Sequence, residues 1–172
     1  MKIEDLNVLF SEEQIQNRIA EVGKELNNLY KGEEVIAISV LKGAVMFTAD
    51  LIKHLNMPVK LEFIRLSSYE GGTVTSGKVN AVDIKLPDLN EKNVLIIEDI
   101  VDTGLTAQFL INFINMNFHV KSLKFCSLLD KKTTRKVDVK PDYYCFDVGD
   151  QFVVGYGLDY DQLYRNLPYI AG

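Results

Sequence analysis

The sequence predicts an α/β protein with a mostly parallel twisted sheet flanked by helices. Apolar runs of strand length alternate along the chain with segments of helical pattern, which is the arrangement that βαβ units produce. Two of these runs, 35–41 and 94–97, are almost unbroken, as expected of strands that are covered on both faces. The 172 residues are expected to form one domain over 1–172, because two independent cores would each be small.

The first helix has the clearest boundaries. Ser11 and Gln14 fit a capping box, an apolar stripe follows on one face, and Gly32 marks the end. Two further helices are expected over 44–54 and 106–116. Strands are expected over 35–41, 59–66, 79–84, 94–97, 120–129, 143–147 and 152–156.

Composition and charge exclude several classes of protein. A content of 47% apolar and 25% charged residues is typical of a globular chain and not of a disordered one. The net charge of −5 argues against broad binding to nucleic acid or to an anionic membrane, and no apolar run approaches the roughly 20 residues of a membrane span. Cys126 and Cys145 form no CxxC pair, and Met1–Asp5 is acidic where a signal peptide is basic. These features predict a cytoplasmic protein.

The segment 94–106 carries the strongest sign of chemistry. Its apolar strand leads directly to Glu98 and Asp99, Asp102 follows, and a Thr-Gly-Leu-Thr turn opens the next helix. Adjacent acids at the end of a buried strand are unfavourable unless a cation or hydroxyl groups meet them. The turn offers hydroxyls and backbone N–H groups to a phosphate at a helix N-terminus. Because ligands of such sheets bind at the carboxyl ends of strands, the segment predicts a sugar-phosphate site; a helix cap at Thr106 is the structural alternative.

This segment resembles the phosphoribosyl pyrophosphate (PRPP) loop of the type I phosphoribosyltransferases. Other motifs resemble the bacterial hypoxanthine-guanine branch of that family: Leu41-Lys42-Gly43, Ser67-Ser68-Tyr69 with Gly71-Gly72-Thr73, Lys131-Lys132-Thr133 with Arg135, Phe152–Tyr160 and Tyr164–Ile170. The resemblance runs from about residue 7 to the C-terminus. It implies the fold of that family, with a small hood built from the N- and C-terminal segments, and a homodimer or homotetramer.

The resemblance also implies a reaction and a set of site residues. The reaction is purine salvage: hypoxanthine or guanine and PRPP give IMP or GMP and pyrophosphate, with Mg²⁺ as the cofactor. Asp102 is implied to be the catalytic general base for the proton on purine N7. The implied binding residues are Glu98, Asp99, Asp102, Thr103, Gly104, Leu105 and Thr106 for PRPP or nucleotide; Lys42, Gly43, Ser68, Tyr69 and Arg165 for pyrophosphate; Lys131, Phe152, Val153 and Asp159 for the purine; and Glu98, Asp99 and Asp159 for the metal.

Three details refine these expectations. Lys131 only donates hydrogen bonds, so it suits the O6 acceptor of a 6-oxopurine and not the amino group of adenine. In the family the Leu41–Lys42 peptide can be cis, and the segment 70–77 is expected to form a lid over the site. Some relatives have a basic residue where this chain has Leu105, which leaves only a backbone donor at that position.

Two alternatives remain open on the sequence. One is an enzyme that prefers xanthine, whose additional oxygen would be recognised near Asp159. The other is a non-catalytic regulator on the same fold that binds RNA, similar to the pyrimidine-operon attenuation proteins. A regulator of that kind needs a basic face, and the net charge of −5 argues against it.

Overall fold

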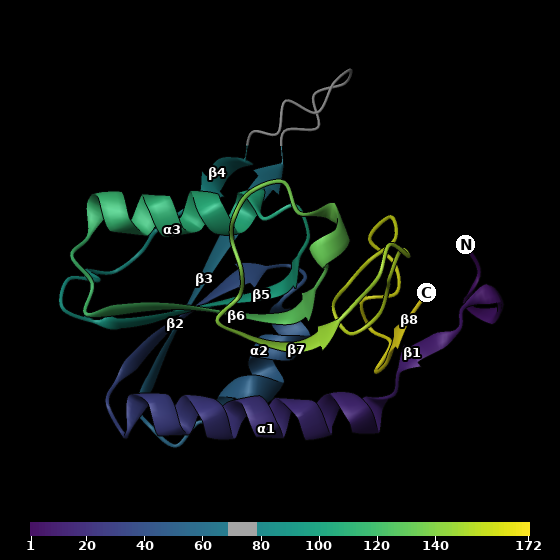
Figure 1. The fold of residues 1–172 in the computed structure, drawn as a ribbon, viewed down its shortest axis with the longest axis horizontal. Helices are drawn as coiled ribbons and strands as arrows, with labels where there is room; N and C mark the ends of the chain where they lie inside the picture. The colour runs from purple at the N-terminus through teal and green to yellow at the C-terminus, as the bar shows by residue number, and fades with distance from the viewer. Residues whose placement is uncertain (69–78) are drawn as a thin grey trace.

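A six-stranded twisted sheet is the centre of the computed structural model, which describes residues 1–68 and 79–172 (Figure 1). The strand order is β4-β3-β2-β5-β6-β7. β4 is antiparallel to β3, and the other neighbouring strands are parallel. The strands are β2 Val35–Leu41, β3 Val59–Ser68, β4 Val79–Asp83, β5 Asn93–Val101, β6 Ser122–Asp130 and β7 Tyr143–Asp147.

The order of strands reverses between β2 and β5. From β2 the chain moves outward to β3 and β4, and it returns to pair β5 with the other side of β2, where Val35 faces Asn93. In open α/β sheets ligands bind at such a switch point, beyond the carboxyl ends of the strands. The topology therefore places the expected site at the ends of β2 and β5.

Helices cover both faces of the sheet (Figure 1). α1 Glu12–Tyr30 and α2 Val45–Ile52 lie on one face, and α3 Leu105–Asn117 lies on the other. The capping box of α1 is formed as expected, since the Ser11 hydroxyl accepts from Gln14 N at 3.1 Å. Each face has its own apolar cluster, so the sheet is buried on both sides.

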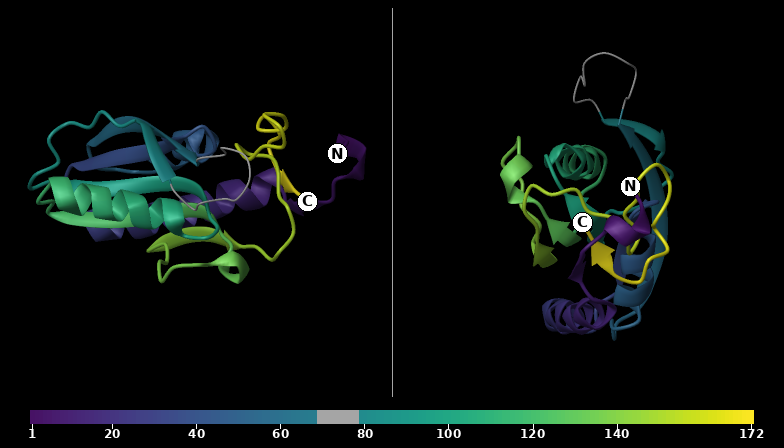
Figure 2. Two further views of the ribbon diagram at one scale, coloured as in Figure 1. Left: turned by 90° about the horizontal axis from the view of Figure 1, so that it is seen from above. Right: turned by 90° about the vertical axis from the view of Figure 1, so that its right-hand side faces the viewer.

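The two ends of the chain meet beyond the sheet (Figure 2). β1 Val8–Phe10 and β8 Ile170–Ala171 form a small antiparallel sheet. The segment after β7, drawn in yellow, lies at the same end of the molecule, together with the short 3₁₀ helix Ile3–Asp5. These parts form the hood that the resemblance implies. The expectation of one domain over 1–172 stays a prediction.

Most of the expected elements are confirmed, with two differences. β5 extends to Val101, because Glu98 and Ile100 continue the ladder with β6. The strand expected over 152–156 is wrong: only a bridge joins Val154 to Ala171, and positive φ angles at Gly155 and Tyr156 turn the chain away from an extended path.

Within the described ranges, none of the helices has both the length and the apolar character that crossing a membrane would require.

Candidate active site

Two adjacent carboxylates lie at the carboxyl end of β5. Glu98 is only 6% exposed, and Asp99 Oδ1 accepts a hydrogen bond from the backbone N–H of Ile100 at 2.7 Å. Burial, and then the charge of Asp99, raise the pKa of Glu98 well above its usual range. Burial also raises the pKa of Asp99, although hydrogen bonds from Glu98 and Ile100 and the charge of Arg165 oppose this. A cation or a hydroxyl-rich ligand would relieve the unfavourable burial of this pair.

The turn after β2 packs directly against this acid pair. A Cβ atom at Gly43 would lie 1.8 Å from Asp99 Oδ2, so only glycine fits here. The Leu41–Lys42 peptide bond is cis, which is a state the resemblance allows. The expected pyrophosphate turn and the expected magnesium ligands are thus brought together by the pairing of β2 with β5.

A cavity of about 210 Å³ opens between the acid pair and the N-terminus of α3. Gly104 caps that helix with a φ of 87°, and Thr103 Oγ1 accepts from Leu105 N at 3.3 Å. The first N–H groups of a helix lack intrahelical acceptors, so this end can bind an anion. The lining residues are Glu98, Asp99, Ile100, Val101, Asp102, Thr103, Gly104, Thr106, Ala107 and Phe125.

Every residue expected to bind PRPP except Leu105 lines this cavity. Leu105 begins α3, and its backbone N–H donates to Thr103 Oγ1.

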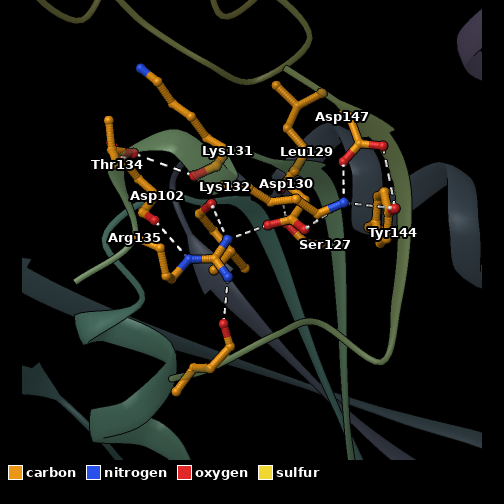
Figure 3. Close-up of polar contacts among 12 residues, drawn as sticks. Asp102, Ser127, Leu129, Asp130, Lys131, Lys132, Thr134, Arg135, Tyr144 and Asp147 are labelled. Carbon is orange, nitrogen blue, oxygen red and sulfur yellow. Dashed lines mark hydrogen bonds and ion pairs between the residues drawn. The ribbon is translucent and has the colours of Figure 1, made fainter. Parts of the chain in front are cut away.

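The segment 131–139 holds the loop 98–106 from outside (Figure 3). Arg135 Nε donates to the backbone oxygen of Asp102 at 3.0 Å, and Arg135 Nη2 donates to that of Val101 at 3.2 Å. The same guanidinium binds the carbonyl oxygen of Val139 and the carboxylate of Asp130, whose side chain is only 2% exposed. A buried ion pair therefore fixes the donors that hold the backbone of the loop.

The Asp102 side chain is also held by this segment. The Thr134 hydroxyl donates to the Asp102 carboxylate, and the backbone N–H groups of Lys131 and Lys136 donate to Val101 O and Thr103 O at 2.9 and 2.8 Å. Asp102 is exposed toward the cavity, which leaves it open to a ligand. These contacts hold the backbone of Lys131 beside Val101, the residue before Asp102.

The hood contains four of the expected residues, Phe152, Val153, Asp159 and Arg165, and none of these four lines the cavity. Arg165 Nη2 lies 3.3 Å from Asp159 Oδ1, and Arg165 Nη1 donates to the carbonyl oxygen of Gly157 at 2.7 Å. Phe152 is 52% exposed and makes an edge contact with the ring of Tyr160. Val153 is buried.

Some expected residues are not brought into the site here. Ser68 ends β3, and Tyr69 and the expected lid over 70–77 lie outside the described residues. Sequence reasoning missed Asp130, Thr134 and Gln162. Thr134 and Gln162 contact the distant residues Asp102 and Lys42, whereas Asp130 contacts Arg135, five residues further along the chain. The only signal for Asp130 is the spacing of two opposite charges, Asp130 and Arg135, at the end of an apolar strand.

The acid pair fits a magnesium ion. Among the residues that the structure describes, no three His, Cys, Asp or Glu side chains form a cluster that could hold a metal. Mg²⁺ does not need such a cluster, because it keeps several waters and takes one or two carboxylates together with phosphate oxygens of a substrate. Glu98 and Asp99 offer that donor set beside a phosphate-binding turn. Asp159, the third expected ligand, already accepts a hydrogen bond from Gln162 N and forms an ion pair with Arg165.

Comparison with known proteins identifies the class. The chain matches the phosphoribosyl transferase domain family over residues 9–161. It therefore belongs to the phosphoribosyltransferases, as the acid pair and the adjoining phosphate turn at the switch point of the sheet indicate.

Individual relatives narrow this to one branch. The chain is 46% identical over 171 residues to the hypoxanthine-guanine phosphoribosyltransferase of Bacillus subtilis, covering 99% of this chain and 94% of that protein. The crystal structure of a hypoxanthine-guanine phosphoribosyltransferase from Bacillus anthracis, with a HEPES molecule in the active site, has a TM-score of 0.91 at 44% identity and covers 96% of this chain and 97% of that one. A Trypanosoma cruzi hypoxanthine phosphoribosyl transferase, studied for the role of its C-terminal region in oligomeric state and activity, has a TM-score of 0.89 at 43% identity and covers 95% of this chain and 89% of that one. The branch is that of the hypoxanthine-guanine phosphoribosyltransferases.

Replacing the buried acid is expected to change how stability depends on pH. Because the pKa of Glu98 is raised in the folded protein, that state binds the proton more tightly than the unfolded chain does. Stability therefore falls as pH rises from the ordinary carboxyl range toward the raised pKa. In Glu98→Gln this decline should be smaller, as measured by urea unfolding without ligand at several pH values. Glu91→Gln, at an exposed position, is the matched control, and an equal decline in Glu98→Gln and wild type would contradict the argument.

Breaking the Asp130–Arg135 ion pair should lower both stability and activity, and a second substitution should restore only the stability. Arg135→Met removes the nearer cation of the buried Asp130, leaving Lys132 Nζ 3.9 Å away, and should lower the free energy of unfolding by up to about 3–5 kcal/mol. Asp130→Leu with Arg135→Met should regain much of that loss, because a buried ion pair can often be replaced by apolar groups. Activity should stay low in the double variant, since Val101 O and Asp102 O still lack the Arg135 donors. Recovery of activity along with stability would show that Arg135 does not position the loop; Lys136→Ala, at an exposed neighbour, is the control.

Proposed function

We propose that this chain transfers the phosphoribosyl group of PRPP to hypoxanthine or guanine, giving IMP or GMP and pyrophosphate in cytoplasmic purine salvage. The observation that carries the proposal is the single cavity that joins the acid pair of β5 to the N-terminus of α3, in a chain of this family. The acid pair suits a metal-bound sugar diphosphate, and the N-terminus of α3 suits a phosphate monoester. Two free, buried cysteines agree with a reducing compartment.

The sugar phosphate is bound by the loop 98–106. The Thr103–Thr106 turn, including Gly104 and Leu105, holds the 5′-phosphate through backbone N–H groups and hydroxyls, while Glu98 and Asp99 face the ribose hydroxyls and hold Mg²⁺. A Mg²⁺ ion held there would supply positive charge that stabilises the leaving pyrophosphate. Gly43 places backbone beside Asp99, and Lys42 and Arg165 meet the pyrophosphate with positive charge, with Ser68 and Tyr69 closing over it.

The purine lies between the hood and the segment 131–136. The Phe152 ring is exposed and suits stacking, and backbone groups at Val153 and the carboxylate of Asp159 recognise the far edge of the base. Lys131 donates to purine O6. Its neighbour Lys132 is held by Asp147 at 2.7 Å, whereas the Lys131 side chain points away from that cluster (Figure 3).

Asp102 acts as the general base. Its carboxylate faces the cavity, and the Thr134 hydroxyl fixes its orientation, so it can accept the proton from purine N7 as the new bond to the sugar forms. The transition state has oxocarbenium character, and the enclosed site holds base, sugar and leaving group in line.

The protein is proposed to act as a homodimer or homotetramer. Large apolar side chains remain exposed on β3 and on α2, among them Phe63 and Met46 at 46% and 38%. RNA and membranes are not proposed as partners, because the net charge is −5.

The choice of purine tests the proposal as a whole. Nucleotide formation with PRPP and Mg²⁺ should proceed with hypoxanthine and guanine and should not be measurable with adenine, which meets Lys131 with a donor. The measurement is a spectrophotometric assay with each of four purines in turn. If xanthine is turned over faster than hypoxanthine and guanine, xanthine is the preferred substrate instead. Salt-sensitive RNA binding without any transferase activity would support a regulator.

The role of Asp102 is tested separately. Asp102→Asn keeps the shape of the side chain but removes the proton acceptor, so kcat should fall by about 10²- to 10⁴-fold. The affinity for GMP, measured by calorimetry, should change much less. Asp138→Asn, at an exposed carboxylate on the neighbouring segment, should keep normal turnover. Near-normal turnover in Asp102→Asn would remove this residue from the role.

A further inference from the structure

Gln162 lies between the two cations assigned to pyrophosphate. Its side-chain oxygen accepts from Lys42 Nζ and from Arg165 Nη2, each at 3.2 Å. Lys42 follows β2, and Arg165 belongs to the hood, so the contact joins parts of the chain that are 120 residues apart. Both cations are donors only, and the oxygen of the amide must therefore face them.

A tight turn presents this side chain to the cations. Tyr160 and Leu163 exchange backbone hydrogen bonds at 3.0 and 2.9 Å around Asp161 and Gln162, whose φ angles are 51° and 67°. Positive φ at both central residues is the geometry of a type I′ turn. The Gln162 N–H also donates to Asp159 Oδ2 at 2.9 Å. Glutamine is not a favoured residue at positive φ, so the turn alone does not explain why a glutamine occupies position 162.

We propose that Gln162 is a residue of the pyrophosphate site that takes the place of a pyrophosphate oxygen when the site is empty. A neutral amide oxygen satisfies Lys42 and Arg165 weakly, whereas the charged oxygens of pyrophosphate form stronger charge-assisted bonds and displace it. The ligand therefore binds with an apparent affinity reduced by the competition, which favours release of the product. This inference rests on the proposed function and deepens it at the same site.

The proposal makes the effect of Gln162 opposite to that of an ordinary binding residue. A side chain that contacts the ligand weakens binding when it is removed. A side chain that competes with the ligand strengthens binding when it is removed, and strengthens its own hold on the cations when it gains a negative charge.

The test measures pyrophosphate binding in the presence of Mg²⁺ by calorimetry, and product inhibition in the forward reaction. Gln162→Ala should lower the Kd for pyrophosphate by about 3- to 10-fold, the size expected for two lost competing hydrogen bonds. Gln162→Asn, which tolerates positive φ but is too short to reach both cations, should act in the same direction. Gln162→Glu should weaken pyrophosphate binding instead. Asp161→Asn, the other central residue of the turn, is the matched control.

Two further variants separate this inference from the proposed function. The affinity for GMP should be unchanged in every Gln162 variant, which shows that the hood is still folded. Lys42→Met should weaken pyrophosphate binding. If it does so while Gln162→Ala and Gln162→Asn bind pyrophosphate no more tightly than wild type, the competition is refuted and the site assignment stands. If Lys42→Met has no effect, both the assignment and the inference are wrong.

Discussion

Burial of two adjacent carboxylates at the end of β5 is the constraint around which the site is built. Glu98 continues the ladder with β6 and cannot move to solvent without breaking strand pairing, and Asp99 is held by the backbone of Ile100. The protein compensates by bringing small or donor groups to the pair: Gly43 from the end of β2, and the charge of Arg165 from the hood. Without a ligand, the buried acid pair is less stable than a pair of amides at the same positions would be. A cation-bound sugar substrate can offset this unfavourable burial.

The loop 98–106 is fixed by a buried ion pair on one side and faces cations with exposed contacts on the other. Below it, the buried pair of Asp130 and Arg135 fixes its backbone carbonyls from the end of β6. Across the site, Lys42 and Arg165 end in exposed contacts that a ligand can replace. A rigidly held loop, facing cations whose contacts a ligand can replace, suits the proposed reaction, in which one phosphate group remains attached to the sugar and another must leave.

The parts of the fold that the sequence predicts are those whose signals are local. A buried strand, two acids, a turn and the start of a helix are contiguous in 94–106. This one segment therefore predicts both the carboxyl end of the strand and the proposed phosphate site. The hood could not be predicted in this way. The interval 152–156 has the composition of a strand, but its path is set by turns at Gly155 and Tyr156 and by the distant partner Ala171. Asp130, Thr134 and Gln162 have ordinary sequence surroundings, and only tertiary contacts give them a role.

The pairing of the chain ends has a consequence during synthesis. Ala171 faces Val8 in the small sheet and also bridges to Val154, next to the proposed purine contact. The N-terminal strand therefore has no partner until residues 170–171 have been made, and the loop that contains Val154 remains without its anchor for the same period. On the ribosome, the sheet and its helices can assemble first, and the proposed purine contact is completed last, when the chain closes on its own beginning.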